Sequence, residues 1–181
     1  LASHDINGNV IYIGSVCKTV APVFRIGYLI ASKEFVDEAA KLRGFVDRQG
    51  DALLELTFAD FIKSGDLDRH IRKVMKIYMQ RRNLFCKLLS DEFDGVFQFK
   101  IPKGGMAVWI KLNLDYSWDT ISEVARKHKL EIGNWQRYDA AKQVHNCIRI
   151  GFAAYNEDEI YELVNKLKKT MAEIKSSQKR G

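Results

Sequence analysis

The residues best suited to chemistry lie close together near the start of the 181-residue sequence. Ser15 and Lys18 occupy a loop that follows Gly14, and Arg25 stands at the start of the next β-favouring run. Arginine offers a planar, permanently charged group to phosphate oxygens, and a hydroxyl with nearby backbone N–H groups can complete such a site. A lysine that is partly buried beside a second cation loses its proton more readily, and its amine then attacks carbonyl carbons. The pattern therefore suits a ligand with both an anionic group and an aldehyde.

The same residues also have a plain structural explanation. Residue frequencies alone favour Lys18 and Arg25 as surface charges that flank a turn, with Ser15 as a turn residue. Arg149 alternates with Ile148 and Ile150 in a β-favouring run, so its side chain is expected on the face away from the core. Lone arginines on strands usually face solvent. The residues by themselves leave both interpretations open.

The composition excludes several classes of protein. An apolar content of 46% is ordinary for a globular chain, and no stretch approaches the ~20 uncharged apolar residues of a membrane span, so no membrane partner is expected. The net charge of +6 is compatible with nucleic acid or with anionic small molecules. Three widely spaced cysteines and four histidines without metal-ligand spacing predict reduced thiols, a cytoplasmic protein and no metal site.

The hydrophobic periodicity predicts an alternation of strands and helices along the whole chain. The first elements are strands at 10–13 and 24–31, a helix capped by Ser32, and a helix around 54–62 after a turn at 49–51. A long helix capped by Asp66 leads to a hairpin within 96–112 and a helix from Ser117 to His128. Strands at 130–132 and 147–152 then precede a last helix, which has a capping box at Asn156 and Glu159 and ends in a frayed tail from 175. The mixture is typical of an α/β or α+β protein.

The segment 14–28, GSVCKTVAPVFRIGY, resembles the lysine motif of fold-type I pyridoxal-phosphate enzymes, the aspartate aminotransferase superfamily. More narrowly, it is similar to the aminotransferase-like domain of MocR-type regulators in the GntR family, whose pattern is approximately G-T-x-S-K-x-L-x-P-x-x-R-x-G-Y. The resemblance continues through residues 59–72, 78–82, 103–106 and 148–153, and so spans nearly the whole chain.

The resemblance implies a fold and a division into domains. The expected fold class is α/β, the C-terminal part of the PLP-dependent transferase fold. Residues 1–65 would form the tail of the large cofactor-binding domain with its linking helices. Residues 66–181 would form the long linking helix and the small α/β domain.

The resemblance also implies roles for single residues. Lys18 would form the internal Schiff base with the aldehyde of pyridoxal 5'-phosphate and shuttle protons at the substrate α-carbon. Ser15 and Arg25 would bind the cofactor phosphate, and Arg149 would pair with the substrate α-carboxylate. Cys17 departs from the family, which usually has serine there, and a thiol is the poorer hydrogen-bonding group.

In this superfamily, the aspartate at the cofactor's ring nitrogen, the asparagine and tyrosine at its hydroxyl, and the stacked aromatic residue lie upstream of the lysine. Only seventeen residues precede Lys18, so the resemblance implies the C-terminal half of a larger unit. We therefore expect the isolated chain to be a poor catalyst that exposes apolar surface. The complete protein would be a homodimer, and in a MocR-type regulator it would bind DNA only through a further N-terminal domain.

Three functions follow from these observations. The first is amino-group transfer between an amino acid and a 2-oxo acid, and the second is a non-catalytic sensor in which the cofactor on Lys18 responds to such a small-molecule effector. The third is direct nucleic-acid binding by a basic helix face. Its residues are Arg69, Arg72, Lys73, Lys76, Arg81 and Arg82. Nearby aspartates and the lack of an aromatic stacking set disfavour this third function.

Overall fold

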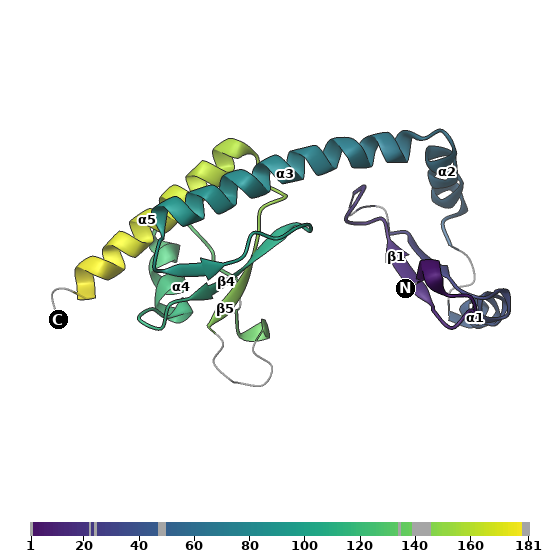
Figure 1. Ribbon diagram of the computed structural model, residues 1–181, viewed down its shortest axis with the longest axis horizontal. Helices are drawn as coiled ribbons and strands as arrows, with labels where there is room; N and C mark the ends of the chain where they lie inside the picture. The colour runs from purple at the N-terminus through teal and green to yellow at the C-terminus, as the bar shows by residue number, and fades with distance from the viewer. Residues whose placement is uncertain are drawn as a thin grey trace. The chain divides into compact units, whose positions relative to one another are not determined.

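We analysed the protein in a computed structural model that describes residues 2–21, 23, 25–46, 50–133, 135–138 and 146–178. The chain divides into two compact units, Leu1–Met75 and Lys76–Gly181, and each is considered by itself (Figure 1). Phe24, placed on a predicted strand, and Gln49, placed in a predicted turn, lie outside the described residues.

The first unit contains a short 3-10 helix, η1 (Ala2–His4), and an antiparallel hairpin of β1 (Tyr12–Ser15) and β2 (Gly27–Ile30). The register pairs Tyr12 with Ile30 and Ser15 with Gly27. Both strands lie in predicted β-favouring runs, but β1 continues through Gly14 instead of ending there. A Cβ atom at Gly14 would overlap the end of the exposed Tyr28 ring, so a larger residue here would require that ring to move.

Two helices follow the hairpin, α1 (Lys33–Val46) and α2 (Ala52–Lys63). The Ser32 hydroxyl accepts a hydrogen bond from Phe35 N–H at 3.3 Å, which confirms the predicted cap. No described residue of α1 is buried. Of its predicted apolar stripe, Phe35, Leu42 and Val46 are exposed and Ala39 is half-buried. The first unit therefore presents extensive apolar surface, as expected for part of a larger fold.

The long helix α3 (Asp66–Glu92) begins in the first unit and ends in the second. It follows Gly65, whose φ of +76° lies in the left-handed region that favours glycine and ends the preceding helix. Asp66 was predicted to be the cap, but the structure makes it the first helical residue, with Ser64 Oγ accepting from its N–H.

The second unit is built on an antiparallel sheet of β3 (Phe97–Phe99), β4 (Ala107–Leu112) and β5 (Cys147–Gly151), in that spatial order. The predicted hairpin is confirmed, with Phe97 opposite Leu112. Alternate residues of β4 are buried, and on β5 Ile148 is buried while Arg149 is exposed, so one face of the sheet forms the core. The buried set on the sheet is Phe97, Val108, Ile110, Leu112 and Ile148.

Helices α4 (Trp118–Lys127) and α5 (Glu157–Gln178) cover this core with the second half of α3, which contributes Phe85 and Leu89. The predicted caps are present: Ser117 caps α4, and Asn156 and Glu159 bond reciprocally at 2.9 and 2.7 Å. A short 3-10 helix, η2 (Trp135–Tyr138), precedes β5. At the surface, Lys127 Nζ lies 2.8 Å from Glu173 Oε1 and lowers the pKa of that carboxyl.

Three further local predictions were wrong. Residues 130–132 form no strand, because Leu130 N–H donates to Ala125 O and so completes the end of α4. Ile101, predicted to continue the alternation of β3, is 62% exposed in the wide connection between β3 and β4. The segment expected to fray from Lys175 is helical as far as Gln178. Among the described residues, no helix combines the length and apolarity needed to cross a membrane.

Candidate functional site

The chain folds into one helical turn directly after β1, and we name residues 15–20 the Lys18 turn. Val20 N–H and Thr19 N–H both donate to Val16 O, at 2.9 and 3.2 Å. Ser15 Oγ accepts from Cys17 N–H at 3.2 Å and donates to Ile26 O at 3.4 Å. Because Val16 is buried and donates from its N–H to Ile26 O, the turn is anchored at its first residues and projects the following ones from the sheet.

The structure brings three of the predicted site residues to one end of the β1–β2 hairpin. Ser15 pairs with Gly27, Arg25 precedes Gly27 by two residues, and Lys18 follows Ser15 by three. All three side chains are exposed. The partial burial expected for Lys18 is therefore wrong within the described part of the chain, where its side chain is exposed.

The sequence on either side of the Lys18 turn carries charges of one sign, whereas Asp60 and Asp66 line a cavity that also borders Val20 of the turn. The sequence from Val10 to Lys33 contains no aspartate or glutamate, whereas Lys18 and Arg25 are both cationic. A guanidinium, a serine hydroxyl and an amine at one hairpin end match the phosphate and the aldehyde of pyridoxal 5'-phosphate. These residues fit that cofactor in charge and in chemical type.

A histidine that the sequence reasoning missed contacts this turn. The ring nitrogen Nε2 of His70, in the second turn of α3, lies 3.1 Å from Thr19 O. The His70 ring also packs against Phe61 of α2, with centroids 6.5 Å apart. His70 falls within the segment 59–72 that carries the resemblance, but no sequence spacing links it to Lys18.

An apolar cavity of about 500 Å³ lies beside the Lys18 turn, bounded by Val20 and by residues of α2 that include Phe58 and Phe61. Phe58 and Phe61 contact each other with ring centroids 6.3 Å apart. The cavity therefore separates this side of the turn from α2, and the two are not tightly packed there.

Arg149 belongs to the second unit, where it lies on β5 directly opposite Trp109 of β4. Its side chain is exposed, whereas Ile148 and Phe152 are buried, so the expected placement away from the core is confirmed. Trp109 makes an edge-to-face contact with Tyr138, with centroids 5.2 Å apart. The outer face of this sheet thus combines a guanidinium with an aromatic pair.

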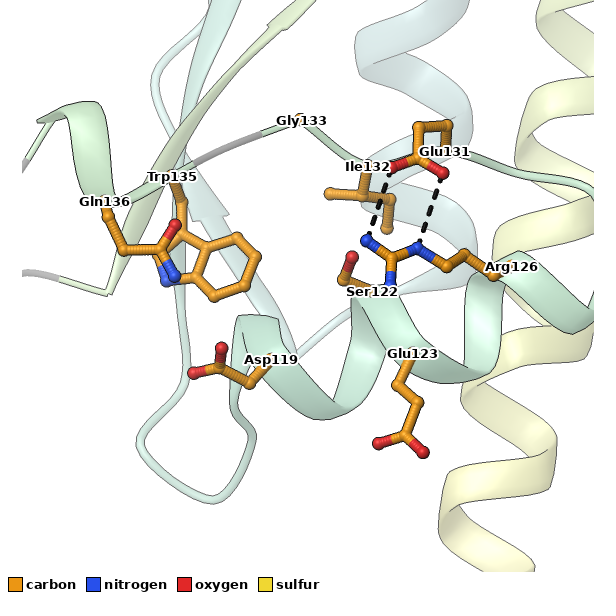
Figure 2. Close-up of a pocket in the computed structure, with 9 residues that line it drawn as sticks. All are labelled: Asp119, Ser122, Glu123, Arg126, Glu131, Ile132, Gly133, Trp135 and Gln136. Atoms are coloured by element: carbon orange, nitrogen blue, oxygen red, sulfur yellow. Dashed lines mark hydrogen bonds and ion pairs between the residues drawn. The ribbon is translucent and has the colours of Figure 1, made fainter.

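A second cavity, of about 700 Å³, opens between α4 and residues 131–133 and 135–136 (Figure 2). Arg126 reaches across it to Glu131, with Nε 3.5 Å from Oε2, and Asp119 and Glu123 add two more carboxylates. None of the predicted site residues lines it. Three carboxylates against one arginine make this cavity a poor match for a phosphate.

The basic face of α3 is partly used within the protein. Arg81 donates to Ala153 O, and Arg82 donates to Pro102 O at 3.1 Å. Arg69 is paired with Asp66. These side chains hold loops and a helix end, which weakens the hypothesis of a nucleic-acid interface on this helix.

Comparison with known proteins agrees with the resemblance. Residues 1–167 match the family described as aminotransferase class I and II. The chain is 26% identical over 169 residues to the HTH-type transcriptional regulator NorG of Staphylococcus aureus (strain USA300), covering 92% of this chain and 37% of NorG. It is 28% identical over 169 residues to aromatic-amino-acid aminotransferase 1 of Thermococcus litoralis, covering 93% of this chain and 40% of that enzyme.

Solved structures show the same fold. The crystal structure of Pyrococcus horikoshii kynurenine aminotransferase matches with a TM-score of 0.82 and 26% identity, over 93% of this chain and 42% of that chain. The chain thus spans about two fifths of the length of the relatives that it matches. With the family match and the shared fold, the chain belongs to the class I and II aminotransferases and has the α/β fold of the C-terminal part of a fold-type I enzyme.

Proposed function

We propose that this chain is the aminotransferase-like part of a longer protein that binds pyridoxal 5'-phosphate at the Lys18 turn and transfers an amino group between an amino acid and a 2-oxo acid. The observation that supports it is the gathering of Ser15, Lys18 and Arg25 at one hairpin end, in a stretch without a carboxylate. Residues 1–65 are assigned to the tail of the large domain and residues 66–181 to the long linking helix and the small domain.

Each residue has a stated task in this proposal. The Arg25 guanidinium would bind phosphate oxygens, and the Ser15 hydroxyl would donate to one of them in place of its 3.4 Å bond to Ile26 O, which would fix the cofactor relative to β1 and β2. The amine of Lys18 would hold the cofactor at its aldehyde carbon, with loss of water, and would also move the proton at the substrate α-carbon. Arg149 orients the substrate through its carboxylate. When bound, the cofactor withdraws electrons from the α-carbon and so makes that proton removable.

The exposure of Ser15, Lys18 and Arg25 supports the proposal that residues outside this chain complete the site. Catalysis of this kind needs a site that excludes water, and the described residues leave the amine in solvent. Full activity is therefore expected only from the complete protein, which we propose to be a homodimer.

Covalent trapping tests the role of Lys18. The complete protein is incubated with pyridoxal 5'-phosphate, reduced with borohydride, digested and mapped by mass spectrometry. The label is expected on the peptide that contains Lys18 and is expected to disappear in Lys18→Ala. The control is Lys33→Ala, because Lys33 is an exposed lysine of α1 outside the hairpin. Equal labelling of Lys18 and Lys33 in the wild-type protein would refute the proposal.

A substrate titration tests Arg149. Charge-assisted hydrogen bonds contribute about 1.5–3 kcal/mol, so Arg149→Ala should weaken the binding of an amino acid by about tenfold to a hundredfold, with little change in cofactor affinity. Lys111→Ala removes an exposed cation of β4 and serves as the matched control. An Arg149→Ala protein that binds the amino acid as tightly as Lys111→Ala would exclude this role.

The similarity to NorG supports a second candidate, a sensor domain in a DNA-binding transcriptional regulator. In such a protein, an amino acid changes the cofactor absorption without multiple turnovers, and DNA is bound by a separate helix-turn-helix domain. Measuring product per subunit separates the two functions. Many equivalents of 2-oxo acid per subunit indicate an aminotransferase, and one equivalent or less indicates a sensor.

A further inference from the structure

We infer that His70 is a positioning residue for Lys18: by a hydrogen bond to the Thr19 carbonyl, it holds the Lys18 turn in the conformation that presents the amine to the cofactor. The inference rests on the proposed function and deepens it, because it assigns control of the same site to a residue of α3. His70 is not expected to touch the cofactor or the substrate.

The hydrogen bond has a defined direction. Thr19 O is a backbone carbonyl and can only accept, so Nε2 of His70 carries the hydrogen and donates across 3.1 Å. The bond joins residues that are 51 positions apart in the chain. By contrast, the bonds of Ser15 and Val16 to Ile26 O stay within the hairpin. The His70 bond therefore connects the turn to a helix, next to the residue that carries the amine.

The geometry of the turn makes this connection important. The turn's own backbone bonds from Thr19 and Val20 both converge on Val16 O, at its beginning. On the side of Val20, the apolar cavity of about 500 Å³ leaves the turn without close packing. A hydrogen bond to Thr19 O therefore restrains the part of the turn that neither the sheet nor the packing restrains.

The histidine itself is held in place by its surroundings. Its ring contacts Phe61, which contacts Phe58, the buried residue of α2. These contacts fix the ring orientation, so Nε2 stays directed at the turn. The helix α3 continues beyond Met75 into the second unit. His70 therefore attaches the Lys18 turn to the helix that belongs to both units.

The test separates the hydrogen bond from the ring contact. His70→Phe keeps an aromatic ring against Phe61 but removes the donor, whereas His70→Gln keeps a side-chain N–H donor but removes the ring. Lys73→Ala removes an exposed side chain of α3 and is the matched control. In each variant of the complete protein, the rate of pyridoxal 5'-phosphate trapping by borohydride is measured at Lys18 and, in the same sample, at Lys33.

A net hydrogen bond corresponds to about a twofold to tenfold change in an equilibrium population. His70→Phe is therefore expected to slow trapping at Lys18 by that factor relative to Lys33, Lys73→Ala to leave it unchanged, and His70→Gln to restore at least part of it. The rates are compared at a urea concentration and temperature at which circular dichroism shows every variant folded.

The outcomes are distinguishable. If the wild-type protein traps no more cofactor at Lys18 than at Lys33, the proposed function fails. If the wild-type protein favours Lys18 and His70→Phe traps it equally fast, only the inference about His70 fails. Slow trapping in both His70→Phe and His70→Gln shows that a donor without the ring does not restore the site, so the hydrogen bond alone does not explain the effect, which also overturns the inference. If His70→Phe does not fold, the comparison of His70→Gln with His70→Ala decides in the same way, because only the former retains a donor.

Discussion

Replacing Ile110 by alanine is predicted to destabilise the second unit strongly. Ile110 lies in β4, the central strand of the three-stranded sheet, opposite Phe99 and Ile148, and its exposure is 0%. Truncating a fully buried isoleucine to alanine costs about 2–5 kcal/mol, because the transfer free energy of the removed atoms is lost and a cavity is left in the core. That is a large share of the about 5–15 kcal/mol that stabilises a typical domain.

Tryptophan fluorescence reports this change selectively, because Trp109, Trp118 and Trp135 are the three tryptophans of the chain and all lie in the second unit. With a urea m-value of about 1–3 kcal/mol per M, a loss near 3 kcal/mol lowers the unfolding midpoint by about 1–3 M. The matched control is Ile101→Ala, at an exposed isoleucine that precedes β4. The free energy of unfolding of this control should differ from wild type by less than about 0.5 kcal/mol. Equal shifts for the two variants would show that the assignment of the core is wrong.

Three further predictions concern single contacts of the second unit. Because Lys127 lowers the pKa of Glu173, Glu173→Gln should reduce stability at pH 7. In urea titrations the difference from wild type should vanish only once the pH falls below that lowered pKa, where the wild-type carboxylate also becomes neutral. Asn156→Ala removes the cap acceptor for Glu159 N–H and should cost about 1 kcal/mol in the same assay, whereas Asn156→Ser should restore most of it. Burial raises the pKa of the Cys86 thiol, so at pH 8 this thiol should resist a disulfide reagent in the native protein and react at once in urea; fast native labelling would contradict its burial.

The elements that the sequence predicted correctly are those specified by local chemistry. Ser32, Ser117 and Asn156 each cap a helix, because a cap depends on residues only two or three positions apart. The strand predicted at residues 130–132 was wrong because three residues, of which only Leu130 and Ile132 are apolar, are too few to establish a period. Here the N–H of Leu130 is used by the end of α4, which no hydrophobic pattern reveals.

The candidate site was predictable in residue type but not in surroundings. Ser15, Lys18 and Arg25 are close in sequence, so a motif could find them, and their roles stay predictions. The exposure of Lys18 depends on which segments cover it, and the motif carries no information about those segments. His70 was missed because its partner at Thr19 is a backbone carbonyl, which every residue type possesses, 51 positions away.

The continuity of α3 determines where the gene can be cut to express the second unit alone. The boundary between Met75 and Lys76 falls inside this helix, so a fragment starting at Lys76 would open with uncapped N–H groups in the middle of a former helix. A fragment that starts at Ser64 retains the hydroxyl that accepts from Asp66 N–H, and it delivers Phe85 to the core on an intact helix. Recombinant yield should therefore favour the longer fragment, although the additional residues belong to the other unit.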